Sequence, residues 1–131
     1  MSVKIGRIGD LFAAAIIESL GASVAIVNQP GCDLIVNYKN KWIRVEVKAT
    51  QNMQKHRRCF TWKTSTGNDT KYHLTKDNCD IVALVALAWR KAAFYHVDDV
   101  SRKTTTHIYE RRMMEIDEEQ MWIKACEKLT T

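Results

Sequence analysis

The sequence lacks the features of a membrane protein and of a low-complexity chain. It has one proline, no internal repeat and no biased tract, and its apolar runs are far shorter than the roughly 18 residues that a membrane span needs. The N-terminus carries charged residues and no signal-peptide pattern, so we expect a cytoplasmic protein, encoded by a bacterium, an archaeon or a phage. At 131 residues, the chain is predicted to fold as a single domain over residues 1–131.

A Cys-x-x-Cys pair is also missing, and this absence argues against a structural zinc site. The four cysteines are scattered along the chain, at Cys32, Cys59, Cys79 and Cys126. Free buried thiols are the commoner state of such cysteines. We therefore expect four cysteines that bind no metal.

Basic residues outnumber acidic ones two to one in the middle of the chain. Residues 51–112 carry twelve basic and six acidic side chains, whereas residues 113–131 carry two basic and five acidic ones. A basic segment in a folded chain indicates a surface for a polyanion such as nucleic acid. Ordinary solubilising charge explains the same pattern equally well at this point.

Hydrophobic periodicity predicts a mixed α/β (α+β) domain. Apolar residues recur at helical spacing over 5–20, and a capping-box pattern at Asp117 and Gln120 opens a second helix near the C-terminus. The buried side of that second helix would consist of Met121, Trp122, Ala125 and Leu129. Apolar runs predict strands at 24–27, 33–38, 41–49, 60–64, 81–88 and 92–97. Loops or turns are expected at 28–31, 51–58, 65–69, 75–78 and 89–91.

Strands 33–38 and 41–49 are close enough in sequence to form a hairpin around residues 39–40. In that register the numbers of facing residues add up to 79, so Leu34 faces Val45 on one side of the sheet and Asp33 faces Glu46 on the other. A slip of one residue would place apolar and charged side chains on the same face, which a half-buried sheet resists. The register therefore predicts two carboxylates directly across from each other.

Facing carboxylates repel each other unless a cation lies between them, because their Cβ atoms are only about 4.5–5.5 Å apart. Lys48 follows Glu46 by two residues and projects from the same face. Mg²⁺ prefers oxygen ligands, and Asp33, Glu46 and the carbonyl of Val47 can supply them; Mn²⁺ is expected to substitute. The metal would activate a water and polarise a phosphate, and Lys48 would orient or deprotonate that water or neutralise the transition state. The alternative is structural: Asp33 ends a turn, and Glu46 pairs with Arg44 or Lys48 on a solvated strand face.

The segments Gly31-Cys32-Asp33-Leu34-Ile35 and Arg44-Val45-Glu46-Val47-Lys48 resemble the PD-(D/E)XK nuclease superfamily. The segment Gly6-Arg7-Ile8-Gly9-Asp10 is similar to the start of that superfamily's first helix. Further similarity, to the small group I intron-associated (homing) endonucleases of the superfamily, lies in Tyr72, Asp77, Asp80, the run 81–87 and residues 96–98. The resemblance covers about residues 4–110.

The resemblance implies a restriction-endonuclease-like core, a mixed central β-sheet flanked by helices. It also implies that Asp33 and Glu46 are metal ligands, that Lys48 is the catalytic lysine, and that Asp10 is an auxiliary acid. Asp10 departs from the usual Glu and, being shorter, would reach the metal through water; a helix N-terminal charge is the alternative role for it. Pro30 also departs from the pattern, since it lies three residues before Asp33 rather than directly before it.

DNA is the expected partner, and a basic cluster after the catalytic strand is the expected contact surface. The predicted DNA-binding residues are Gln51, Lys55, His56, Arg57, Arg58 and Lys63. Further candidates are Lys71, Arg102 and Lys103, with Trp42, Trp62 and Trp89 as stacking or core residues.

The leading functional hypothesis is thus a Mg²⁺-dependent DNA endonuclease of the homing, intron-associated type. A Holliday-junction resolvase, similar to the archaeal type, would use the same active site. A non-catalytic nucleic-acid-binding protein, or an interaction module, would keep the fold without the chemistry. Paired cuts require two active sites, so a homodimer or higher homo-oligomer is expected.

Overall fold

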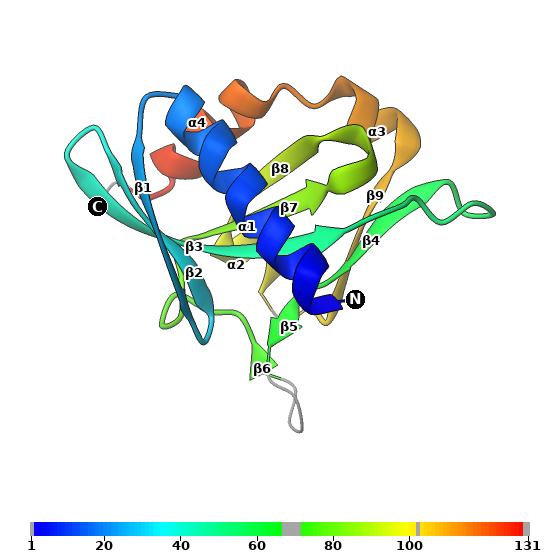
Figure 1. Ribbon diagram of the computed structural model, residues 1–131, viewed down its shortest axis with the longest axis horizontal. Helices are drawn as coiled ribbons and strands as arrows, with labels where there is room; N and C mark the ends of the chain where they lie inside the picture. Colours follow the sequence, from blue (N-terminus) through cyan, green and yellow to red (C-terminus); the bar gives the residue numbers. More distant parts are fainter. Residues whose placement is uncertain (1, 67–71, 102, 130–131) are drawn as a thin grey trace.

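The computed structural model describes residues 2–66, 72–101 and 103–129 (Figure 1). The helices are α1 (Ser2–Ser19), α2 (Val97–Val100), α3 (Glu110–Glu115) and α4 (Glu118–Glu127), with a 3-10 turn at Leu87–Trp89. The strands are β1 (Ser23–Gln29), β2 (Cys32–Tyr38), β3 (Lys41–Thr50), β4 (Cys59–Lys63), β5 (Ser65–Thr66), β6 (Tyr72–His73), β7 (Ile81–Ala86), β8 (Lys91–His96) and β9 (Thr105–Tyr109). No helix in the described ranges is long and apolar enough to span a membrane.

The centre of the fold is a five-stranded sheet with the strand order β1-β2-β3-β7-β8. The pairs β1–β2, β2–β3 and β7–β8 are antiparallel, whereas β3 and β7 run parallel. The sheet is therefore mixed, as the sequence predicted. All six residues of β7 are buried, which confirms that this apolar run is a strand covered on both faces.

One face of the sheet is covered by α1 and α4. Ala13 and Ile17 of α1 and Trp122 of α4 belong to the same apolar cluster as the inward-facing residues of β2, β3, β7 and β8. The Trp122 ring meets the rings of Tyr38 and Phe94 edge-on, with centroid distances of 5.7 and 5.3 Å. The predicted buried side of the C-terminal helix is confirmed, since Trp122 and Ala125 are buried and Met121 and Leu129 pack against the same cluster.

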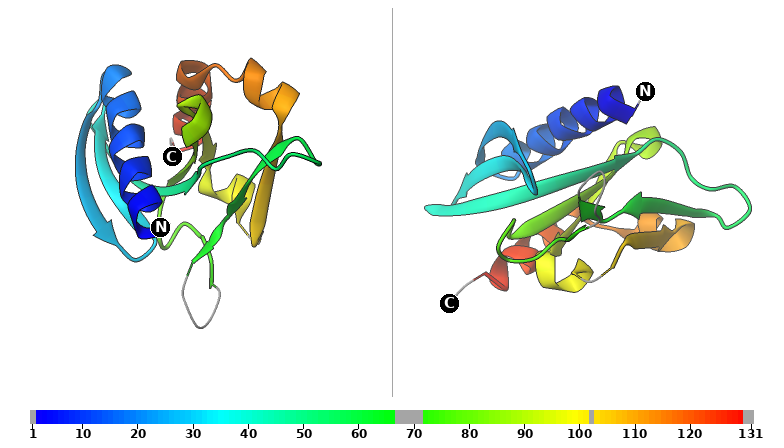
Figure 2. Two further views of the ribbon diagram at one scale, coloured as in Figure 1. Left: turned by 45° about the vertical axis from the view of Figure 1, so that its right-hand side comes forward. Right: turned by 90° about the horizontal axis from the view of Figure 1, so that it is seen from below.

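A two-stranded ribbon, β4–β9, lies over the other face of the sheet. Phe60 and Trp62 point inward from it, and the Trp62 indole N–H donates a hydrogen bond to the Val85 carbonyl of β7 at 2.9 Å. Figure 2 (left) shows the ribbon on the side of the molecule opposite α1. The ribbon and the short helices α2 and α3 complete the second apolar cluster.

Several boundaries differ from the predictions. The predicted strand 81–88 ends at Ala86, because the chain turns at Leu87–Trp89 and Arg90 adopts a left-handed conformation with φ 50°. Strand β9 and helix α3 were not predicted, since β9 has only five residues, of which the first three are polar, and α3 has only six. The predicted turn 65–69 begins with the two-residue strand β5, and its remaining residues lie outside the described ranges.

Candidate active site

The β2–β3 hairpin has the register that its apolar pattern predicted. Leu34 pairs with Val45 and Tyr38 with Lys41, so the numbers of facing residues add up to 79. The next step in this register brings Asp33, near the start of β2, to Glu46. Asp33 Oδ2 accepts a hydrogen bond from the backbone N–H of Val47 at 2.8 Å, which fixes the carboxylate at the point where the pairing of the two strands ends.

Glu46 is almost completely buried, with 5% of its surface exposed. Its Oε2 lies 3.1 Å from the Lys48 ammonium, but its Oε1 has no hydrogen-bond partner among the described residues. A buried carboxylate oxygen without a partner is costly in free energy. Burial, reinforced by the charge of Asp33 and opposed by Lys48, raises the pKa of Glu46 to about 8. Glu46 thus pairs with Lys48, as the structural alternative predicted, but on a buried and not on a solvated strand face.

Arg44, the other predicted alternative partner of Glu46, is engaged elsewhere. Its guanidinium makes a two-point ion pair with Asp80 at 3.0 and 3.2 Å, and its backbone N–H donates to the same carboxylate. The Arg44 carbonyl in turn accepts the Asp80 N–H at 2.8 Å. Arg44 therefore holds the 74–80 loop against β3 and leaves Glu46 to Lys48.

The same backbone geometry orients the Val47 carbonyl. The N–H and C=O groups of one strand residue point to the same side, as Arg44 shows by directing both toward Asp80. Val47 directs its N–H toward Asp33, so its carbonyl also faces the side where Asp33 lies. We call the place where β2 and β3 separate, next to Asp33 and Val47, the fork. Two carboxylates, those of Asp33 and Glu46, and the carbonyl of Val47 thus surround the fork.

Asp10 reaches this fork from α1. It is buried, with 7% of its surface exposed, although it lies in the first half of an exposed helix. Burial first, and then the negative charge of Asp33, raise the pKa of Asp10 to about 7, and the nearby Arg7 partly opposes this rise. Asp10 therefore lies close enough to Asp33 for the two carboxylates to interact electrostatically.

Two glycines make the close packing around the fork possible. A Cβ added to Gly9 would lie 2.6 Å from the Cβ of Ala49, so α1 can touch β3 only with glycine at this position. Gly31 has φ +77°, and a Cβ there would lie 2.8 Å from the Cβ of Asn78 in the 74–80 loop. Both contacts bring separate segments of the chain to the four predicted catalytic residues.

Cysteines line the fork but do not extend the ligand set. All four cysteines are free, and Cys32, Cys59 and Cys79 are buried, which confirms the expectation of buried thiols. Burial and the charge of Glu46 raise the pKa of Cys79 to about 12 and shift that of Cys32 upward. Across residues 2–66, 72–101 and 103–129, no three Cys, His, Asp or Glu side chains converge as a ready-made metal centre.

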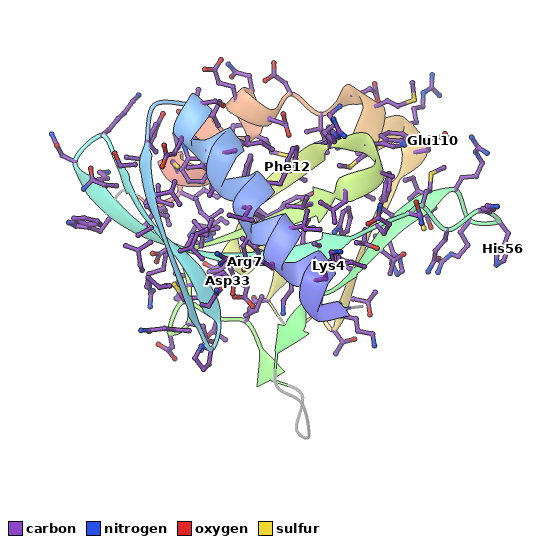
Figure 3. All side chains as sticks on the ribbon, viewed as in Figure 1. Lys4, Arg7, Phe12, Asp33, His56 and Glu110 are labelled. Carbon is purple, nitrogen blue, oxygen red and sulfur yellow. The ribbon has the colours of Figure 1, made fainter. Side chains whose placement is uncertain are left out.

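The predicted DNA-binding residues lie on the surface. All six, Gln51, Lys55, His56, Arg57, Arg58 and Lys63, are exposed. Figure 3 shows His56 at the tip of the β3–β4 loop, far from Asp33. Arg58 is held at the base of this loop, where its Nε donates to Glu110 Oε1 at 2.7 Å.

The remaining candidates have different environments. Trp62 is buried and Trp89 packs edge-on against Phe60, whereas Trp42 is 73% exposed. Lys103 is exposed. Lys71 and Arg102 lie outside the described residues.

Sequence reasoning missed two contributors to the site. The first is Arg7, whose spacing of three from Asp10 places both on neighbouring turns of one helix face. The charge of Arg7 acts on the carboxyl of Asp10. The second is the Arg44–Asp80 pair, which joins residues 36 positions apart and leaves no local signal in the sequence.

The fold has a counterpart among solved structures. It is similar to the bacterial homing endonuclease I-Ssp6803I, with a TM-score of 0.72 and 14% sequence identity, over 98% of this chain and 94% of that one. No protein-family model and no curated protein sequence matches the chain. The expected fold class, a mixed sheet flanked by helices, is therefore confirmed, and the chain has a homing-endonuclease-like fold.

Proposed function

We propose that the protein is a Mg²⁺-dependent DNA endonuclease of the homing type, built on a PD-(D/E)XK active site. The observation that carries the proposal is the buried Glu46 beside Asp33 and Lys48, which keeps one carboxylate oxygen without a hydrogen bond from any described residue. The fold around this site is similar to that of a protein described as a homing endonuclease. Burying like charges side by side is unfavourable, so such an arrangement is expected where a cation binds.

The donor set fits Mg²⁺ better than Zn²⁺. The carboxylates of Asp33 and Glu46 and the carbonyl of Val47 are hard oxygen ligands, and Mg²⁺ needs few protein ligands because it keeps several waters and binds substrate phosphate. Asp10 would complete the set through a water. Cys32 and Cys79 are free buried thiols, and Mg²⁺ favours hard oxygen ligands over soft sulfur ligands.

When bound, Mg²⁺ supplies Lewis acidity that polarises the phosphate and makes an attacking water more acidic. Hydrolysis forms one bond from phosphorus to the water oxygen and breaks the bond to the leaving oxygen, which takes up a proton. Lys48, held by Glu46 at 3.1 Å, donates hydrogen bonds to the water or to a phosphate oxygen as negative charge accumulates. Val47 keeps Asp33 aligned through its N–H, so the acidic groups need little rearrangement during the reaction.

The exposed basic loop between β3 and β4 would hold the DNA backbone beyond the cut. Lys55, His56 and Arg57 lie there, and such contacts provide affinity without reading sequence. A cut in both strands needs two such sites, so we propose that the protein acts as a homodimer or a higher homo-oligomer.

Cleavage assays with defined variants test the proposal. The protein is incubated with supercoiled, linear and four-way-junction DNA, in Mg²⁺, in Mn²⁺ and in EDTA. We expect cleavage only with metal, and a loss of at least 100-fold in Asp33→Asn, Glu46→Gln and Lys48→Met. Glu119→Gln, which removes an exposed carboxylate of α4, is the matched control and should cut normally. Cleavage in EDTA, or full activity in Glu46→Gln, would contradict the mechanism.

Calorimetric titration with Mn²⁺ measures the metal site without any need for the target sequence. The wild type should bind Mn²⁺, and Glu46→Gln should bind it at least tenfold more weakly. A preference for junction DNA would favour a resolvase. DNA binding with neither cleavage nor metal binding would favour a non-catalytic nucleic-acid-binding protein and refute the nuclease.

A further inference from the structure

The N-terminal half of α1 places a positively charged residue, Arg7, near the fork. Arg7 precedes Asp10 by three residues, so their side chains leave neighbouring turns of the same helix face. The charge of Arg7 acts on the Asp10 carboxyl, as does the charge of Asp33, and the two labelled side chains lie close together in projection in Figure 3. The contact of Gly9 with Ala49 fixes the distance of this helix from β3.

Arg7 is exposed and makes no ion pair with any residue of the described ranges. A structural counter-charge would be expected to contact its carboxylate, as Arg44 contacts Asp80. Instead, Asp10 is buried with 7% of its surface exposed, whereas Arg7 on the same helix face is exposed. Arg7 is thus an exposed cation at the edge of an acidic site.

A guanidinium in this position fits a phosphate. The planar guanidinium can donate two parallel hydrogen bonds to phosphate oxygens. A phosphate that approaches Asp10, Asp33 and Glu46 also needs a cation to offset the repulsion between their negative charges and its own. Lys48 is already bound to Glu46, and the β3–β4 loop is remote from the fork. We propose that Arg7 binds a backbone phosphate of the DNA next to the acidic residues of the site. This inference rests on the proposed function, because it assumes that DNA occupies the fork.

The salt dependence of DNA binding tests the contact without any cleavage. Fluorescence anisotropy with a labelled duplex of random sequence, in EDTA and at several NaCl concentrations, gives the slope of log K against log salt. Loss of one phosphate contact reduces the size of this slope by about 0.9, and we expect Arg7→Gln to show this loss with roughly tenfold weaker binding. Arg7→Lys should restore the slope, because lysine keeps the positive charge. It should restore only part of the affinity, because lysine lacks the planar guanidinium that donates two parallel hydrogen bonds.

The matched control is Lys124→Gln, which removes the same charge from an exposed position of α4. Arg, Lys and Gln have similar helix propensities, so none of these variants should unfold a helix. A wild-type slope in Arg7→Gln would overturn the proposal. A wild-type slope together with a lower melting temperature would also overturn it and would assign Arg7 a purely structural role.

The outcomes separate this inference from the nuclease proposal. If the wild type cuts DNA and Arg7→Gln keeps the wild-type slope, the phosphate contact is refuted and the nuclease stands. If the wild type neither cuts DNA nor binds Mn²⁺ but shows an Arg7-dependent slope, the contact stands and the nuclease is refuted. A wild type that binds no DNA refutes both.

Discussion

Gly9 allows a direct test of how α1 is attached to the sheet. Gly9→Ala would place a Cβ 2.6 Å from the Cβ of Ala49, whereas ordinary contacts start at 3.4 Å. The helix must therefore move away from β3 by roughly 1 Å, because optimal carbon contacts lie at about 3.5–4.0 Å. Overpacking of this kind costs about 1–3 kcal/mol. The Ala side chain also favours the helix by about 0.5–1 kcal/mol, which offsets part of the cost.

Gly6→Ala is the matched control. It lies in the same helix, and a Cβ there meets nothing within 4 Å. It should therefore raise stability by about 0.5–1 kcal/mol. The helix term is the same in both variants, so the difference between them, about 1–3 kcal/mol, isolates the clash at Gly9. For a domain of this size the difference corresponds to roughly 4–12 °C in melting temperature.

Urea denaturation followed by circular dichroism measures both free energies of unfolding. Ala49→Gly should rescue Gly9→Ala in a double-mutant cycle, because it removes the atom that the new Cβ meets. Equal stabilities of Gly9→Ala and Gly6→Ala would refute the packing argument, as would the absence of any coupling with Ala49. Gly9→Ala should also weaken Mn²⁺ binding more than Gly6→Ala does, since the shift carries Asp10 away from the fork.

Three further variants test the burial and the contacts of the site and its surroundings. Without metal, the free energy of unfolding should fall as pH rises from about 5 to 8, because the pKa of Glu46 is raised to about 8 and the folded protein keeps a proton that the unfolded chain has released. Urea titrations at several pH values should show that Glu46→Gln makes the free energy of unfolding less dependent on pH. An unchanged pH dependence in this variant would contradict the assignment of the effect to Glu46. Asp80→Asn should lower stability by about 1–2 kcal/mol, because the partly exposed Arg44 loses its charged partner; a thermal melt checks this, and no change would mean that the pair is fully screened. Trp62→Phe should cost about 1–2 kcal/mol by leaving the buried Val85 carbonyl without its indole donor, and denaturation with no loss would contradict that account.

Local patterns were sufficient for the centre of the candidate site. Apolar alternation on both strands of the β2–β3 hairpin allows only one register that keeps Leu34 and Val45 inside. That register alone brings Asp33 to Glu46 and places Lys48 on the same face. The predicted boundaries of α1 and of most sheet strands also lie within a few residues of the observed ones.

Short elements stabilised by distant partners could not be predicted. Strand β9 pairs with β4 across more than 40 residues, and its five residues carry no periodicity strong enough to indicate a strand. Helix α3 has only six residues and one buried side chain, Met113. Their conformations depend on the apolar cluster beneath the ribbon, which forms only when the chain has folded.

The amino-acid sequence by itself determined which groups could bind a metal, since residue types and the two-residue period of a strand are local properties. Only the tertiary structure decided their state. Glu46 is buried because β7 pairs beside it, and Asp10 and Arg7 reach the fork because Gly9 lets α1 touch β3. Burial and proximity depend on segments far apart in the chain, and these two quantities raise the pKa values of both acids and place a guanidinium beside them.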